Sequence, residues 1–225
     1  MFHVKQFFFL LFLLPFFSFA QHFGATTLPV RAMPKLPPKN ILILKFLDNY
    51  SEYKSLDSAQ KEWFYWTNYS RSNPKRFWDS IVSPIITAYP TLNNSFTSSL
   101  KKDLHAAGPL PSVKPNTNLL KVSETFSREM SSKNASPSHT SPSGVAFPDR
   151  MKAAGIIKCA GENISFGPSN PLIMLVLLYI DEGVPGLGHR RTLLNPTFTE
   201  MGIGISEYSD NKNSIVIQDF ACTQK

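Results

Sequence analysis

Cysteine is scarce in this chain, with only two among 225 residues. Two thiols exclude a small domain held together by several disulfides, and they exclude a four-cysteine zinc site. Charge is sparse as well, because Asp, Glu, Lys and Arg make up 17% of the residues. Hydrophobic residues make up 42%, which excludes a fibrous or disordered chain. The length indicates one domain, or one domain with an extension.

The charges that are present are mostly basic. There are 23 Lys and Arg against 16 Asp and Glu, a formal net charge of +7. Such a surplus would fit a nucleic-acid partner only if it formed a basic stripe interleaved with aromatic residues. No such stripe occurs, and we therefore predict no nucleic-acid partner.

The only long hydrophobic run lies at the start of the chain. Residues 7–14 are wholly apolar, Lys5 precedes them, and the small residues Ser18 and Ala20 follow. This pattern predicts a secretory signal peptide over residues 1–20, with an uncleaved anchor as the alternative. The apolar stretch 171–180 is about half of what a bilayer requires. We expect a secreted or periplasmic protein with no transmembrane anchor after signal cleavage.

The mature chain divides into an extension and one domain. Residues 21–56 begin with a proline-rich, basic stretch, which predicts a linker or N-terminal extension. Residues 57–225 form the predicted domain. Its apolar spacing and turn residues predict a terminal hairpin of strands 201–208 and 214–221. We expect an α+β fold with these helices: 57–72, 74–86, 92–104, 118–133, 149–154 and 171–180.

Three polar stretches in or beside loops carry the residues of chemical interest. They are residues 138–144, 159–164 and 181–196. Loops placed by a rigid scaffold commonly carry binding and catalytic groups. Spacing alone assigns these residues no function.

The order of the motifs in these stretches resembles the CAP superfamily. His139 begins His-Thr-Ser-Pro-Ser-Gly, Gly161 begins Gly-Glu-Asn-Ile, and Gly188 begins Gly-His-Arg-Arg-x-Leu-Leu-Asn-Pro. Gly-Ile-Gly-Ile and Gln-Asp-Phe follow in the terminal hairpin, and Asn68 begins an Asn-x-x-Arg element. The chain is similar to the small exported bacterial form of these SCP-like proteins, a group that includes the cysteine-rich secretory, antigen 5 and pathogenesis-related proteins. The resemblance covers about residues 63–222 and implies an α-β-α sandwich with a central antiparallel sheet.

The resemblance also implies a cleft that contains two histidines and two acids. The histidines are His139 and His189, and one acid is Glu162. The second acid falls in the pair Asp181 and Glu182, of which Glu182 is favoured. The chain departs from the animal and plant members, which have an aromatic-rich stretch after the second histidine and many disulfides.

Imidazoles of this kind could bind a divalent metal such as zinc. His139 and His189 would be the ligands, and two histidines fall short of the three protein ligands typical of catalytic zinc. If Glu162 also ligates, or acts as a base, hydrolysis by a metal-bound water becomes feasible. Both residues could instead have purely structural roles: Glu162 could hold a loop by hydrogen bonds to its backbone, and His189 could cap a helix.

The remaining candidates are weaker. Ser141 and Ser143 lie near His139, but they do not form a Ser-His-Asp triad and the chain has no Gly-x-Ser-x-Gly elbow. His105 lies outside the shared motifs and is interpreted as a surface residue. Cys159 and Cys222 could form a disulfide that closes a loop of about 60 residues, worth on the order of 4 kcal/mol; two buried thiols are the alternative.

Two classes of function follow from these residues. We favour a non-catalytic exported binding module for a lipid, a cell-wall component or a protein partner. The alternative is a metal-dependent hydrolase, most plausibly a peptidase, that uses His139, His189 and Glu162. A third reading is that the histidines and acids have lost their role and that the loops bind an unrelated partner.

Overall fold

A computed structural model describes residues 28, 31–167, 170–210 and 212–224. The predicted signal peptide lies outside these residues. The four strands are β1 (Lys114–Pro115), β2 (Ala160–Gly167), β3 (Glu200–Glu207) and β4 (Ser214–Ala221). The α-helices are α1 (Ile41–Asp48), α2 (Ser51–Ser55), α3 (Ser58–Ser72), α4 (Pro74–Phe77), α5 (Ser83–Ala88), α6 (Ser95–Ala106), α7 (Thr117–Ser132), α8 (Phe147–Ala153), α9 (Pro171–Ile180) and α10 (Gly188–Leu193). Short turns of other helix types occur at Trp78–Val82, Pro90–Leu92 and Pro185–Leu187.

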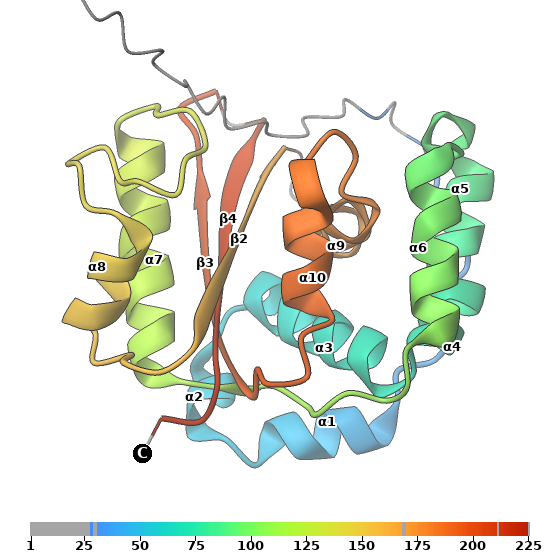
Figure 1. Cartoon of the computed structure of the whole chain (residues 1–225), viewed down its shortest axis with the longest axis horizontal. Coiled ribbons are helices and arrows are strands. Elements are labelled where there is room, and N and C mark those ends of the chain that lie inside the picture. Colours follow the sequence, from blue (N-terminus) through green and yellow to red (C-terminus); the bar gives the residue numbers. More distant parts are fainter. Residues whose placement is uncertain (1–27, 29–30, 168–169, 211, 225) are drawn as a thin grey trace, which may run out of the picture.

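The sheet lies between two layers of helices (Figure 1). Its strand order is β1-β3-β4-β2, and only the two-residue β1 is parallel to its neighbour. Helices α7 and α8 cover one face, and α3, α9 and α10 lie on the other side. The predicted α-β-α sandwich with a central antiparallel sheet is therefore confirmed.

Helix α7 packs unusually close to β3 because two strand positions lack a side chain. A Cβ at Gly204 would lie 2.0 Å from the carbonyl oxygen of Ser123. A Cβ at Gly202 would lie 2.2 Å from the carbonyl carbon of Leu119. The Gly-Ile-Gly-Ile motif thus sets the distance between helix and sheet, and it brings Ser123 within reach of the strands.

Replacement of Gly204 by alanine is expected to destabilise the domain by roughly 2–3 kcal/mol, because the added methyl group must displace the α7 backbone. Chemical denaturation of the variant and the wild type measures the loss. Gly108→Ala is the matched control, since a Cβ there meets no atom within 4 Å. Equal stabilities for Gly204→Ala and the wild type would show that α7 does not pack closely on β3.

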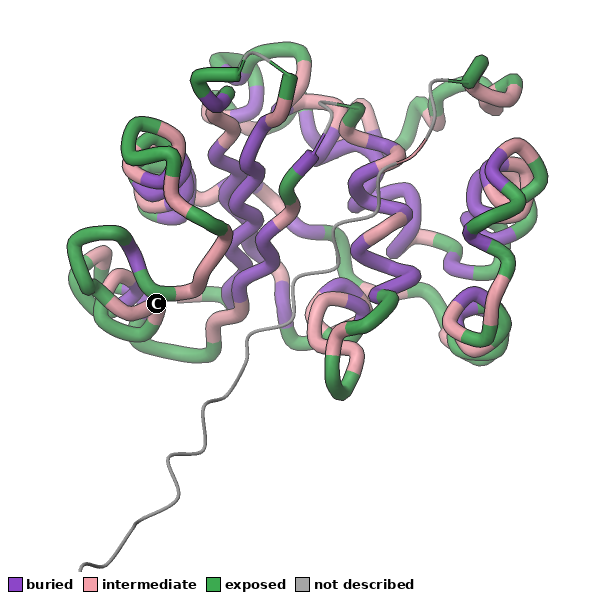
Figure 2. Tube along the Cα trace, turned by 90° about the horizontal axis from the view of Figure 1, so that it is seen from above, coloured by how far each residue is buried: buried purple, intermediate pink, exposed green. Residues whose placement is uncertain are grey.

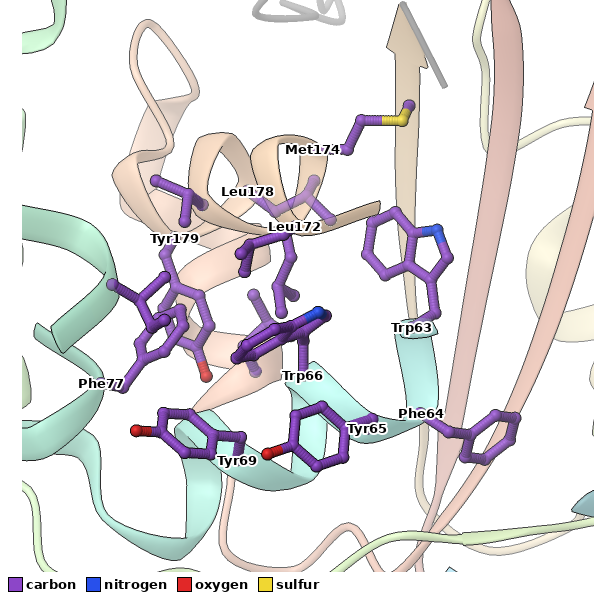
Figure 3. Close-up of a cluster of buried hydrophobic side chains, with 14 of the residues drawn as sticks. Trp63, Phe64, Tyr65, Trp66, Tyr69, Phe77, Leu172, Met174, Leu178 and Tyr179 are labelled. Carbon is purple, nitrogen blue, oxygen red and sulfur yellow. The ribbon is translucent and has the colours of Figure 1, made fainter. Parts of the chain in front are cut away.

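The main core contains a group of aromatic side chains that joins α3 to α9 (Figure 3). Tyr179 of α9 is fully buried and packs on Phe77, with ring centroids 5.1 Å apart. Its hydroxyl donates to Ser70 of α3 at 2.8 Å. Figure 2 shows that buried positions follow the strands and the inner helices, whereas exposed positions lie at outer turns. The buried aromatic residues of α3 are Trp63, Phe64, Tyr65, Trp66 and Tyr69.

Most of the predicted helices occur with small shifts at their ends. Asp57 caps α3 through a capping box with Gln60. The piece expected at 74–86 is α4, a π-helical turn and α5. Helix α9 has the predicted bounds: Asn170 accepts from the backbone of Ile173, and Pro171 occupies the first turn. The terminal hairpin is also present as β3 and β4.

Two predictions of local structure differ from the structure. Residues 41–55, assigned to the extension, form α1 and α2 and contribute Ile43, Leu47 and Tyr53 to the core. Residues 161–163, expected in or beside a loop, lie in strand β2. Among the described residues, no single helix is long and apolar enough to cross a membrane; the bent pair Pro171–Ile180 and Pro185–Leu193 meets that test only when combined.

Candidate functional site

Glu162 and His139 form the first histidine–acid pair of the site. Glu162 lies in β2, with its side chain only 1% exposed. Its Oε1 is 2.7 Å from Nδ1 of His139, which lies in the loop after α7. An ionised carboxylate only accepts hydrogen bonds, so the geometry assigns the proton of this contact to Nδ1. The ring is therefore oriented with Nε2 directed away from the acid.

Arg150 of α8 holds this pair together, and the sequence analysis did not identify it. Its guanidinium contacts Oε2 of Glu162 at 2.5 Å and donates to the carbonyls of His139 (2.9 Å) and Val145 (3.0 Å). It also stacks on Phe126, 3.6 Å from the ring centroid. One arginine thus pairs with Glu162 and holds the loop that carries His139 at two points.

His189 and Asp181 form the second pair. Asp181 follows the last residue of α9 in the left-handed conformation (φ +58°), which Asp adopts more readily than most residues. Its Oδ1 is 2.7 Å from Nδ1 of His189, and its Oδ2 accepts from the backbone N–H of Arg190 at 3.1 Å. The side chain of Asp181 is fully buried.

Of the two candidate acids, Asp181 is therefore the one that contacts His189, whereas the sequence analysis favoured Glu182. Glu182 is exposed and accepts a hydrogen bond from the Asn94 side chain at 2.9 Å. The left-handed turn at Asp181 ends α9 and sends the two neighbouring carboxylates in different directions. Sequence adjacency could not reveal this turn.

The acids of the two pairs come from different elements, Glu162 from the edge strand β2 and Asp181 from the end of α9. Glu162 faces α7 and α8, whereas the next residue, Asn163, faces the other helix layer, because side chains alternate along a strand. The Asn163 side chain hydrogen-bonds Gln218 at 3.2 Å, and Gln218 in turn reaches Thr67 of α3 at 3.0 Å. Each acid thus orients its own histidine, and both imidazoles have Nδ1 engaged.

A third acid, Asp219, is buried beside the first pair, and the sequence analysis gave it no role. It is the direct register partner of Glu162 across the β2–β4 ladder. Its Oδ2 accepts from Ser123 at 2.8 Å, and its Oδ1 has no hydrogen-bond partner among the described residues. Burial and the neighbouring Glu162 carboxylate raise the pKa of Asp219 well above its usual range, against smaller opposing effects of Ser123 and Arg150.

The residues described above come from motifs that also occur together in one known protein family. The model of the Cysteine-rich secretory protein family (CAP) matches residues 67–220. The chain belongs to the CAP family. Its matched region holds all the residues of the two histidine–acid pairs and Asp219.

Individual relatives of this CAP protein are distant. The uncharacterized protein YkwD of Bacillus subtilis (strain 168) is 31% identical over 125 residues, 54% of this chain. The aligned part is 46% of YkwD, so the chain spans about half the length of that curated relative. An extracellular protein with an SCP domain from Bacillus anthracis str. Ames has 20% identity and a TM-score of 0.46, over 84% of this chain and 45% of its own. Venom allergen-like protein 4 of Schistosoma mansoni has 13% identity and a TM-score of 0.44, over 76% and 92% of the two chains.

The serines of the first loop of the CAP domain have local partners. Oγ of Ser141 lies 2.8 Å from Oγ of Ser143 and accepts from the backbone N–H of Val145 at 3.1 Å. These contacts hold the turn that follows His139. The described contacts give neither hydroxyl an imidazole as its base. His105, interpreted as a surface residue, is exposed on α6.

The disulfide of the CAP domain joins the start of β2 to the end of β4. Cys159 and Cys222 are bonded, with their Cα atoms 5.6 Å apart. The prediction of this pair is confirmed, and the two-thiol alternative is wrong. The bond closes the end of the sheet next to Glu162 and Asp219. Across the parts of the chain that the structure describes, no group of three or more His, Cys, Asp or Glu is arranged to hold a metal.

Proposed function

We propose that this CAP protein is an exported, non-catalytic binding module, secreted or periplasmic, whose ligand is a lipid with an apolar chain. The observation that carries the proposal is a pocket of about 450 Å³ between α7 and α8. Export is supported by the predicted signal peptide, by the disulfide, and by similar structures described as an extracellular protein and as an outer surface protein of Borrelia burgdorferi.

The lining of the pocket fits an apolar chain. Its apolar wall is formed by Phe126 and smaller side chains, and its charged residues are Lys121, Glu129 and Arg150. Ligand pockets of this size are lined mainly by apolar groups, with few polar groups to fix orientation. The apolar residues of the wall are Val122, Phe126, Val145, Ala153 and Ala154.

Arg150 links the pocket to the first histidine–acid pair. Arg150 lines the pocket and also contacts Glu162 and the carbonyl of His139. Ser141 and Val145, from the loop that carries His139, form another part of the wall. A ligand in the pocket would therefore contact the residues that hold His139 in place.

Titration with a fluorescent fatty-acid analogue tests the pocket. We expect saturable binding by the wild type and at least about tenfold weaker binding by Ala153→Trp, because the indole would occupy the space of the chain. Ala106→Trp, at an exposed position on α6, is the matched control and should bind as the wild type does. Equal binding by Ala153→Trp would contradict the pocket, and binding of cell-wall fragments or a protein in place of the analogue would contradict the lipid.

A divalent metal such as zinc is a secondary proposal. Because both Nδ1 atoms contact carboxylates, Nε2 of His139 and of His189 would be the ligands. Glu162 and Asp181 each use both carboxylate oxygens within the protein, which supports an orienting role for these acids. Metal analysis of untagged protein, compared with the His139→Ala/His189→Ala variant, tests this proposal.

The metal-dependent hydrolase is the competing proposal. It requires Glu162 as base or ligand, whereas the contacts of Glu162 with Arg150 and His139 favour a positioning role. Peptide turnover that is lost with a chelator and with Glu162→Gln would favour the hydrolase over the binding module.

A further inference from the structure

The charges around Glu162 do not balance if every acid is ionised. Glu162 and Asp219 are both buried, and the two lie directly opposite each other in neighbouring strands. The charged group that faces them from α8 is Arg150. From α7 they meet the neutral Ser123, and Gly202, opposite Asp219 on β3, has no side chain. Two carboxylates with one guanidinium would leave a net negative charge in a site from which water is excluded, which is costly.

The hydrogen-bond partners indicate which acid carries a proton. Glu162 accepts from two strong donors, Arg150 and Nδ1 of His139. Asp219 accepts only from the hydroxyl of Ser123, and its Oδ1 lacks a donor among the described residues. An un-ionised Asp219 turns that oxygen into a donor, and the Glu162 carboxylate lies beside it across the β2–β4 ladder.

We propose that Asp219 is a positioning residue that stays un-ionised and donates its carboxyl hydrogen to Glu162. Glu162 then accepts three hydrogen bonds, one each from Arg150, His139 and Asp219. This third bond fixes the carboxylate that selects the His139 tautomer, so Asp219 acts on the exposed ring through Glu162. The inference concerns the network itself and stands apart from the identity of any ligand in the pocket.

The pH dependence of stability distinguishes an un-ionised Asp219 from an ionised one. In the unfolded chain Asp219 loses its proton near the ordinary value of 3.8. The folded protein retains this proton to higher pH, so its contribution to stability is complete below that value and declines as the pH rises. We expect the wild type to lose stability relative to Asp219→Asn as the pH rises above about 4, by up to about tenfold in the folding equilibrium per pH unit.

Two variants and one spectroscopic signal complete the test. Asp219→Asn keeps a neutral donor and should preserve the His139 tautomer seen by ¹⁵N NMR, whereas Asp219→Ala removes the donor and should disturb it. Asp149→Asn, at an exposed position on α8, controls for the loss of one carboxyl group. If Asp219→Asn does not fold, infrared spectra of wild type labelled with ¹³C-aspartate still decide, because an un-ionised carboxyl band should persist at neutral pH. Absence of that band, or a gain in wild-type stability over Asp219→Asn with rising pH, would overturn the proposal.

Discussion

Replacement of Glu162 by alanine is expected to destabilise the protein by about 3–5 kcal/mol. The change removes the carboxylate that pairs with Arg150, whose side chain is only 9% exposed. The guanidinium would lose the carboxylate that it contacts directly, and the loop that carries His139 would lose its anchor. Urea denaturation followed by circular dichroism measures the change in the free energy of unfolding.

Asp79→Ala is the matched control for this experiment. Asp79 pairs with Lys75 at 2.9 Å, but both side chains are at least half exposed. Removal of such a surface pair should have little effect on the free energy of unfolding, because water screens the exposed charges. Similar losses in the two variants would mean that Arg150 reaches water when Glu162 is gone, and the network would then not depend on a buried ion pair.

Replacement of Arg71 by methionine is the second large effect, a loss of at least about 4 kcal/mol. Arg71 is wholly buried at the end of α3, and its guanidinium donates to four backbone carbonyls. The distances are 3.0 Å to Pro111, 2.8 Å to Leu193, 3.1 Å to Asn195 and 2.8 Å to Phe198. Methionine fills similar space but donates nothing, and each buried acceptor left unpaired costs about 1–3 kcal/mol.

Thermal unfolding of Arg71→Met and Arg76→Met separates hydrogen bonding from charge. Arg76 is exposed on α4, so its replacement removes the same charge from the surface. We expect a small shift for Arg76→Met and a large one for Arg71→Met. A small shift for both would show that the carbonyls find other donors, and Arg71 would then not tie α3 to the segment before β3.

The parts of the fold that the sequence predicts are those with strong local signals. Asp57 and Gln60 mark the start of α3, and Asn170 with Pro171 marks the start of α9. The hairpin follows from two apolar runs on either side of a polar turn. In each case the signal lies in residues that are neighbours in the chain, so a single sequence contains it.

The features that sequence reasoning missed depend on contacts between distant segments. Helices α1 and α2 follow a proline-rich stretch, and their burial depends on packing against α3. Arg150 and Asp219 meet Glu162 only because α8, β2 and β4 come together. Their own surroundings in sequence contain no signal for that meeting. Apart from the Gln-Asp-Phe motif that contains Asp219, nothing in the chain pointed to either residue.

The motifs predicted the members of the site better than its arrangement. His139, His189 and Glu162 were identified from three separated stretches, and the structure places each histidine on a buried acid. The resemblance implied one cleft with four residues, and the structure shows that each histidine of this set contacts its own acid, Glu162 in β2 or Asp181 after α9. The arrangement depends on strand alternation and on the turn at Asp181, which no motif encodes.

Two-dimensional NMR of the wild type during titration with a fatty acid tests the central claim most directly. If the protein is a binding module with its ligand between α7 and α8, the amide signals of Val122, Phe126 and Ala153 should shift saturably. The ring signals of His139 should move with them, because Arg150 joins the pocket to that loop. Saturable shifts confined to another surface, or no shifts at all with the protein folded, would contradict the account.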